Sequence, residues 1–197
     1  MNRWRLAATA ALAALIVAAC VGCGSSHPKV SGPPPSPYRG FQLKPPTAAP
    51  AFDLRDQAGQ ALGSQSERGH WFVVAFLYTH CPDVCPLIAN NLGTAMRKLP
   101  DLRVLAVSVD PKGDTPAAVR TFLRVHRLPA RFRYLTGTRA ELAPVWKKFH
   151  VAALPGPNGT ITHNTFELLV DPSGEERLFY DSTLRAADLE HDLPLLQ

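Results

Sequence analysis

The apolar residues of this chain fall into short continuous runs and into longer stripes with helical spacing. The runs at 71–78 (WFVVAFLY) and 102–109 (LRVLAVSV) are rich in β-branched and aromatic residues, so they predict two buried strands. The segment 86–99 carries apolar residues at the spacing of one helix face and predicts an amphipathic helix between the two strands. A strand, a helix and a second strand in this order indicate an α/β sheet.

The rest of the pattern continues the alternation. The further predicted elements, in chain order, are a hairpin of 52–55 and the segment after 59, a threonine-capped helix from 115 to about 127, a strand at 132–135, a helix across 142–149, a hairpin of 166–171 and 177–180, and a helix at 184–193. The loop at 152–162 contains PGPNG and is predicted to be irregular. This order predicts a thioredoxin-like α/β fold, with a mixed central sheet flanked by helices and an N-terminal hairpin extension.

The N-terminal part of the chain lacks such a pattern. Residues 24–50 are rich in Gly, Ser and Pro and predict an extended tether in front of one folded domain. Residues 6–19 are uncharged and follow Arg3 and Arg5, as in a signal peptide, and they are too few to span a bilayer comfortably. The predicted parts are a lipoprotein signal peptide at 1–19, a lipid-anchored tether at 20–50 and a thioredoxin-like domain at 51–197.

The end of the apolar stretch, 17–20 (VAAC), resembles the lipobox of bacterial lipoproteins. In that interpretation Cys20 becomes the lipid-modified N-terminus, and the protein is anchored to a cell membrane on its extracytoplasmic side. The alternatives are a plain secretory signal or an uncleaved anchor. In the lipobox interpretation Cys23 is left over, as a free thiol, an alternative lipidation site or a tether residue without a role.

The charge of the chain is mildly positive. The full sequence carries +5, and two of its 21 basic residues precede Cys20, so 19 basic and 16 acidic residues leave +3 after that point. A charge this small and dispersed argues against a nucleic-acid partner. Arginines concentrate between 120 and 139, which suits an acidic partner or lipid headgroups, although a solvated helix face followed by a loop is the simpler interpretation.

Two cysteines four residues apart are the strongest chemical signal. They lie in 79–86 (THCPDVCP), which places Cys81 in the loop before the predicted helix and Cys85 within or just before its first turn. One helical turn sets Cα atoms about 6 Å apart, which permits a disulfide or a shared soft metal ion. The helix N-terminus favours thiolate at both residues. A structural disulfide would close too short a loop to stabilise the fold much, so a functional pair is favoured.

Several segments together resemble the Sco/SenC family, and the resemblance covers essentially the whole predicted domain. They are YTHCPDVCP at 78–86, APAFDLRDQ at 49–57, SVDP at 108–111, DTP at 114–116 and TG at 136–137. The resemblance implies a membrane-tethered, thioredoxin-like protein that binds copper. It also implies a role in building the binuclear copper (CuA) centre of cytochrome c oxidase subunit II.

The resemblance implies a ligand set as well. In the family, copper is held by the two cysteines and by a histidine just before a strand that ends in Asp-Pro-x-Gly. The corresponding strand here ends in DPSG at 171–174, so the ligands are expected to be Cys81, Cys85 and His163. Thr162 replaces the usual acidic residue before that histidine, which changes its expected support. Two thiolates and one imidazole suit Cu(I), and also Cu(II) with a further ligand, whereas structural zinc normally takes four ligands.

The other histidines are interpreted as surface or hydrogen-bonded residues without a metal-binding role. These are His70, His80, His126, His150 and His191. His80 adjoins Cys81, but adjacent residues in a loop rarely point in the same direction.

Three functions fit these residues. A copper metallochaperone would receive one copper from a copper donor protein, hold it at Cys81, Cys85 and His163, and deliver it to the CuA domain of oxidase subunit II. An enzyme, an extracytoplasmic thiol-disulfide reductase, would attack with Cys81 and resolve with Cys85. A redox sensor or peroxidase-like protein is the third hypothesis, and the Pro and Thr that precede a peroxidatic cysteine are missing here. The metallochaperone is favoured, with reductase activity as a second act of the same protein.

Overall fold

The computed structural model of the protein describes residues 36–197, and the predicted signal peptide, Cys20 and Cys23 lie outside this range. The strands of its central sheet are β1 (Phe41–Ala48), β2 (Asp53–Asp56), β3 (Ala61–Gly63), β4 (Phe72–Leu77), β5 (Arg103–Ser108), β6 (Phe132–Thr136), β9 (Phe166–Val170) and β10 (Glu175–Asp181). They lie side by side in the order β1-β10-β9-β4-β5-β6-β2-β3. The predicted mixed sheet is therefore confirmed.

The two predicted apolar strands lie at the centre of this sheet. β4 runs parallel to β5, and β5 runs parallel to β6, whereas β9 joins the other side of β4 in antiparallel pairing. Every residue of β4 is buried. A strand covered on both faces needs apolar residues at consecutive positions, which explains the continuous run at 71–78.

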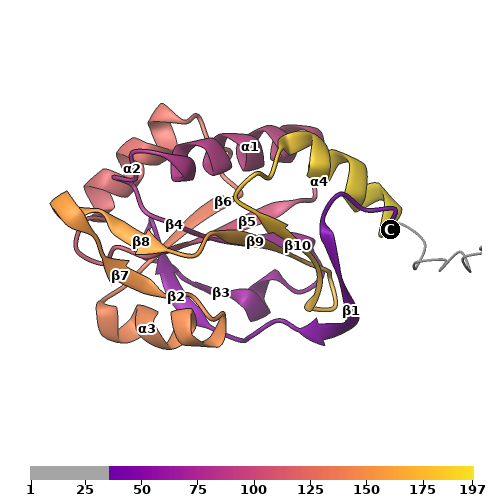
Figure 1. Ribbon diagram of the computed structural model, residues 1–197, viewed down its shortest axis with the longest axis horizontal. Helices are drawn as coiled ribbons and strands as arrows, with labels where there is room; N and C mark the ends of the chain where they lie inside the picture. The colour runs from indigo at the N-terminus through magenta and orange to yellow at the C-terminus, as the bar shows by residue number, and fades with distance from the viewer. Residues whose placement is uncertain (1–35) are drawn as a thin grey trace, which may run out of the picture. The chain divides into compact units, whose positions relative to one another are not determined.

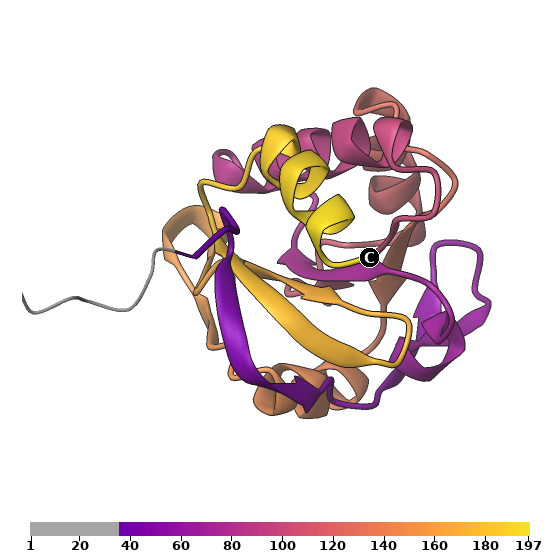
Figure 2. The same ribbon diagram turned by 90° about the vertical axis from the view of Figure 1, so that its right-hand side faces the viewer.

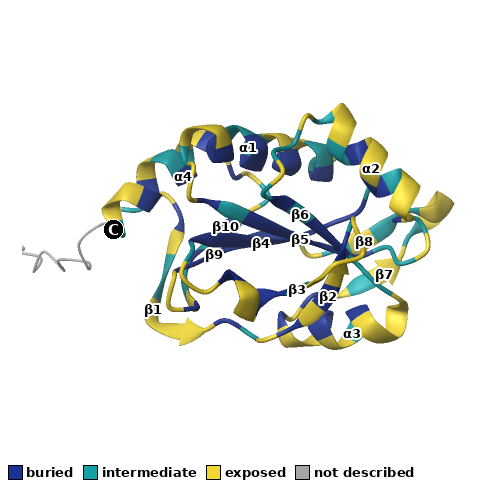
Figure 3. Ribbon diagram, turned by 180° about the vertical axis from the view of Figure 1, so that it is seen from behind, coloured by how far each residue is buried: buried dark blue, intermediate teal, exposed yellow. Residues whose placement is uncertain are grey.

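Helices cover both faces of the sheet. They are α1 (Val84–Lys98), α2 (Pro116–Val125), α3 (Arg139–Lys148) and α4 (Ala186–Asp192), with short 3-10 turns at Ser64–Glu67, Pro157–Gly159 and Leu193–Leu195. α1, α2 and α4 lie on one face and α3 on the other (Figure 1). Buried positions follow the inner sides of the helices and the central strands, and exposed positions follow the outer sides (Figure 3). Within the described residues no helix is both long and apolar enough to cross a membrane.

β1 contradicts the predicted end of the tether at residue 50. Phe41 pairs with Phe179 of β10 and Ala48 pairs with Glu175, and the ladder is irregular between Gln42 and Thr47. Figure 2 shows β1 along the outer edge of the sheet. Proline is tolerated on an edge strand because the outward N–H groups there have no partner strand, so the Pro-rich composition hid this strand from sequence reasoning. The folded part begins well before residue 51.

The segment 152–162, predicted to be irregular, contains a hairpin of its own. β7 (Ala153–Pro155) pairs antiparallel with β8 (Ile161–His163), and these two strands form a second sheet outside the central one. The N–H of Gly156 donates to the carbonyl of Thr160 over 2.7 Å and closes the turn. Asn158 and Gly159 take the positive φ angles that this turn requires. The Pro and Gly residues thus build a turn between two strands, and the second strand ends at His163.

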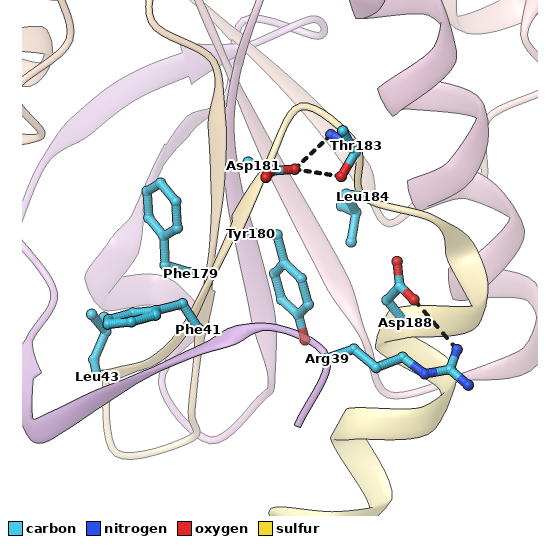
Figure 4. A pocket seen from close by; sticks show the side chains of 9 residues that line it. All are labelled: Arg39, Phe41, Leu43, Phe179, Tyr180, Asp181, Thr183, Leu184 and Asp188. Atoms are coloured by element: carbon cyan, nitrogen blue, oxygen red, sulfur yellow. Dashed lines mark hydrogen bonds and ion pairs between the residues drawn. The ribbon is translucent and has the colours of Figure 1, made fainter. Parts of the chain in front are cut away.

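A pocket of about 530 Å³ lies between β1, β10 and α4 (Figure 4). On its rim the guanidinium of Arg39 pairs with the carboxylate of Asp188 at 3.3 Å. Nearby, the hydroxyl of Tyr180 donates to the carboxylate of Asp192 over 2.9 Å. The first contact joins the start of the described chain to α4, and the second joins β10 to α4. None of the predicted ligands lines this pocket.

Candidate metal centre

The thiol pair lies where β4 ends and α1 begins. Cys81 stands in the loop, and its N–H donates to the carbonyl of Tyr78 over 3.3 Å. Cys85 lies in the first turn of α1. Both thiols are free, and Cys81 is partly exposed whereas Cys85 is completely buried. The predicted positions of both cysteines are confirmed.

The two thiols have opposite electrostatic surroundings. The pKa of Cys81 is lowered to about 5, first because the Cys85 thiol donates a hydrogen bond to its sulfur, with further donation from the backbone N–H groups of Asp83 and Cys85. The Cys85 N–H lies 3.5 Å from that sulfur. The pKa of Cys85 is raised because it is the donor in the shared hydrogen bond and because it is buried. The prediction that the helix N-terminus favours thiolate at both residues is therefore wrong for Cys85.

His163 ends β8 with one ring nitrogen engaged. Its Nδ1 lies 3.0 Å from the backbone carbonyl of Asn164. A carbonyl only accepts, so Nδ1 carries the proton and Nε2 keeps a free lone pair for a metal. Burial lowers the pKa of His163, which favours the neutral imidazole. The carbonyl of Asn164 therefore supplies an orienting acceptor, although Thr162 stands where an acidic residue was expected.

Asn164 also fixes the base of the hairpin. Its side-chain amide donates to the carbonyl of His150 over 3.2 Å and accepts from the N–H of Ala152 over 2.8 Å. These bonds tie the end of β8 to the chain that follows α3. The sequence signal for this role is an asparagine directly after the candidate histidine.

Tyr78 lies between the histidine and the thiols. Its ring meets the ring of His163 edge-on, with centroids 6.1 Å apart. Burial raises the pKa of Tyr78, and the charge of Cys81 acts on both Tyr78 and His163. Among residues 36–197, however, no three His, Cys, Asp or Glu side chains gather closely enough to hold a metal ion. The fold brings the three predicted ligands into one region without closing them into a site.

A buried carboxylate holds the loop that leads to Cys81. Asp114 accepts hydrogen bonds from the N–H and the hydroxyl of Thr79, both at 2.7 Å. It also accepts from the hydroxyls of Ser108 at 2.5 Å and Tyr134 at 3.0 Å. Thr115 caps α2, as the sequence predicts, which leaves the carboxylate of the neighbouring Asp114 free to accept from these buried donors. Asp114 supports the candidate site through its contact with Thr79, which lies 35 positions earlier in the chain. No local sequence pattern reveals such a contact.

The remaining histidines are engaged elsewhere. His80 is exposed and its Nδ1 lies 3.0 Å from the hydroxyl of Thr79. The other four are His70 beside Arg103, His126 beside Asn90, His191 beside Asp192, and His150, which is exposed. No metal cluster within the described residues includes any of them.

Comparison with known proteins identifies the family. The SCO1/SenC family model matches residues 42–194. The chain belongs to the SCO1/SenC family. An SCO2-like protein of Rickettsia typhi is 31% identical over 135 residues, which are 64% of this chain and 66% of that protein. The chain therefore spans about two thirds of the length of this relative.

Solved structures of Sco proteins share the fold. Copper-bound ScoI of Bradyrhizobium japonicum has a TM-score of 0.63 and 29% identity, and the match covers 77% of this chain and 100% of that one. BsSco, described as a member of the Sco family of cytochrome c oxidase assembly proteins with a disulfide switch, has a TM-score of 0.64 and 25% identity over 78% of this chain and 96% of that one. The predicted family and the thioredoxin-like fold are both confirmed.

Proposed function

We propose that this Sco protein is a copper metallochaperone. It binds one copper through Cys81, Cys85 and His163, receives the metal from a copper donor protein and delivers it to the CuA centre of cytochrome c oxidase subunit II. Membership of a family of oxidase assembly proteins supports the role, and so does the copper-bound structure of a relative.

One observation carries the proposal. The two free thiols lie at and just before the start of α1, and Tyr78, whose carbonyl accepts from the Cys81 N–H, packs edge-on against the ring of His163, whose Nε2 is free. Two sulfurs and one nitrogen form a soft donor set that suits Cu(I). The three side chains do not lie close enough together to hold a metal ion as they stand, so we expect the β7–β8 hairpin to move toward the thiols when copper binds. The hairpin lies outside the central sheet, which supports such a movement.

The protonation states define what copper binding releases. At neutral pH Cys81 is the thiolate and Cys85 is the thiol, since their pKa values are shifted in opposite directions. Both sulfurs must be thiolates to bind Cu(I). The uptake of one Cu(I) therefore releases one proton, from Cys85.

The ligand set is tested by anaerobic Cu(I) titration of residues 36–197 against a competing chelator. The variants are Cys81→Ser, Cys85→Ser and His163→Ala, and the matched control is His80→Ala, which removes the histidine next to Cys81. We expect one copper per chain in the parent and the control. Each cysteine variant should lose tight binding, and His163→Ala should bind at least about tenfold more weakly. A His163→Ala variant with the affinity of the parent would contradict the ligand assignment.

Disulfide reduction is a second candidate function, favoured by the exposure difference between the thiols. Cys81 is reachable and is a thiolate at neutral pH, whereas Cys85 is buried behind it. The Cys81 thiolate would attack a partner disulfide, and Cys85, after losing its proton, would then displace the partner. Two electrons pass to the partner, which leaves as two thiols, and a Cys81–Cys85 disulfide remains. His163→Ala should keep this exchange rate while losing copper, which separates the two functions.

We also propose that Cys20 carries a lipid that anchors the protein on the extracytoplasmic side of the cell membrane. The supporting observation is the VAAC sequence at the end of an uncharged stretch. Cys20→Ala should release the mature chain into the soluble fraction, and Cys23→Ala is the matched control that should stay with the membrane. Retention of Cys20→Ala together with loss of Cys23→Ala would reassign the lipid to Cys23.

A further inference from the structure

Helix α2 lies directly beside the loop that carries Cys81. A groove of about 410 Å³ separates the two elements. Its loop side is formed by Thr79 and His80, and its helix side by Ala117, Ala118, Thr121, Phe122, Val125 and His126. A protein that approaches the partly exposed Cys81 across Thr79 and His80 therefore passes over this groove and α2.

The outer side of α2 carries unpaired positive charge. Between 115 and 140 the chain contains six arginines and no Asp or Glu. Arg131 and Arg133 donate to neighbouring groups, and Arg139 lies over the ring of Trp146. The other three, Arg120, Arg124 and Arg127, are exposed, and their side chains contact no acceptor among the described residues.

Two of these arginines form a row on α2. Arg120 and Arg124 stand at i and i+4, on one face of the helix, whereas Arg127 follows the C-cap residue His126 with a positive φ. Next to this row lie the exposed groove residues Ala117, Thr121 and Val125, of which Val125 is 64% exposed. We call these five residues the α2 face. Arginine is enriched at protein interfaces, and the small side chains beside the row leave room for a partner close to the thiol loop.

The same observations argue against a lipid bilayer as the occupant. A helix that inserts into a membrane surface needs a broad apolar side turned outward. Of the large apolar residues of α2, Val119 and Phe122 are buried in the core of the domain and Leu123 packs partly against it. Val125 is the one that is exposed, so the helix has little to insert. The arginine row then fits a protein surface with complementary charge better than it fits lipid headgroups.

We propose that the α2 face docks a copper-exchanging partner protein that presents carboxylates around its own metal site. This inference rests on the proposed function. Opposite charges on the two proteins steer the encounter, and the row beside the groove orients the partner so that its ligands meet Cys81. Docking of this kind raises the association rate more than the final affinity, and it weakens as salt is added.

The test compares two charge-reversal variants of the chain. Arg120→Glu/Arg124→Glu alters the α2 face, and Lys147→Glu/Arg185→Glu makes the same charge change at exposed positions on α3 and at the start of α4. Circular dichroism and Cu(I) titration establish that both variants fold and bind copper like the parent. The milder Arg120→Gln/Arg124→Gln variant serves if the reversal unfolds the chain. The probe is the apo CuA domain of oxidase subunit II from the same organism.

The readouts are the second-order rate of copper transfer at low and physiological salt, and NMR shift changes in the chain when the probe is added. In the parent, the rate should fall with salt. In the α2 variant it should be at least about tenfold slower at low salt and nearly independent of salt, and the control should stay within about twofold of the parent. Shift changes in the parent should cluster on the α2 face.

The outcomes separate this inference from the proposed function. Copper transfer at the parental rate in the α2 variant overturns the docking surface and leaves the chaperone function standing. Probe-induced shifts on the α2 face without copper transfer support the docking surface and overturn delivery to CuA. No shifts and no transfer overturn both. Loss of binding to phosphatidylglycerol vesicles in the α2 variant, with transfer unchanged, overturns the protein partner in favour of a membrane surface.

Discussion

Two buried carboxylates of this domain, Asp114 and Glu167, have opposite surroundings. The exposed fraction is 4% for Asp114 and zero for Glu167. Asp114 accepts four hydrogen bonds from three residues, whereas neither carboxylate oxygen of Glu167 has a partner among the described residues. Burial raises the pKa of both groups, and for Glu167 the nearby Asp181 raises it further.

The difference follows from where each residue lies. Asp114 stands beyond the end of β5, beside the loop that carries Cys81, and its partners are hydroxyls and an N–H that would otherwise be buried without acceptors. Glu167 is the second residue of β9, paired with Ala75 of β4 and Tyr180 of β10, at a position that suits an apolar residue. One carboxyl therefore stabilises the candidate site, and the other destabilises the sheet.

Removing the Asp114 carboxylate should have the largest effect. Asp114→Ala leaves Thr79, Ser108 and Tyr134 without their acceptor, so we expect the free energy of unfolding to fall by about 3 kcal/mol, measured by urea denaturation. Copper affinity should also fall, because Thr79 no longer holds the loop. Asp110→Ala is the control, since that carboxylate receives only turn N–H groups from Lys112 and Gly113. Equal losses in the two variants would contradict a special role for Asp114.

Replacing Glu167 should have a smaller effect of the opposite sign. Glu167→Leu keeps a similar volume and removes an unpartnered buried carboxyl, so the free energy of unfolding should rise by about 2 kcal/mol at neutral pH. Urea denaturation measures it. Glu175→Leu, at an exposed position of β10, should give no such gain. A loss of stability in Glu167→Leu would mean that the carboxyl has a favourable interaction.

The pH dependence of stability isolates the charge of Glu167. Its folded-state pKa is raised above the unfolded value of about 4.3, so the folded chain keeps a proton that the unfolded chain loses. This contribution to stability is complete below about pH 4.3 and is lost as the pH rises toward the folded-state pKa, by at most about 1.4 kcal/mol per pH unit. Glu167→Gln should remove that slope in denaturation measured between about pH 4 and 8. An unchanged slope would assign the titration to other groups.

The smallest expected effect is that of the Asp114 charge on the pKa of Cys81. Its charge contributes to the raised pKa of Cys85 but is not among the causes of the low pKa of Cys81. In Asp114→Asn, the pH profile of Cys81 alkylation should therefore keep its midpoint near pH 5. Cys85→Ala should move the midpoint upward, because it removes the main hydrogen bond to the Cys81 sulfur. Equal shifts in the two variants would show that Asp114 acts on Cys81 directly.

Sequence reasoning succeeded where the signal is local. Residues close together in the sequence decide several features that were predicted correctly. These are the apolar runs of β4 and β5, the threonine cap of α2 and the placement of Cys81 and Cys85. It failed for β1 and for the β7–β8 hairpin. β1 is stabilised by pairing with β10, which lies more than 120 positions later in the chain. The β7–β8 hairpin contains glycine and proline, and because these residues are as common in irregular loops as in tight turns, they did not indicate the hairpin.

The candidate site divides in the same way. The motif around the cysteines and the family resemblance identified the three expected ligands, but the protonation state of each depends on contacts made in the folded chain. Cys85 keeps its proton because it is buried and donates to Cys81, and Nε2 of His163 is free because a backbone carbonyl takes the proton of Nδ1. The contacts of Tyr78 with His163 and of Asp114 with Thr79 join residues too far apart in sequence for any one motif to span.

The sequence by itself determined the family, the order of strands and helices, and the position of the thiol pair at a strand-to-helix turn, because each depends on local pattern and short-range geometry. Only the tertiary structure decided which carboxyls are satisfied, which thiol carries the proton and which arginines stand unpaired beside the thiol loop. The physical reason is that hydrogen bonding and desolvation depend on which distant residues come into contact when the chain folds.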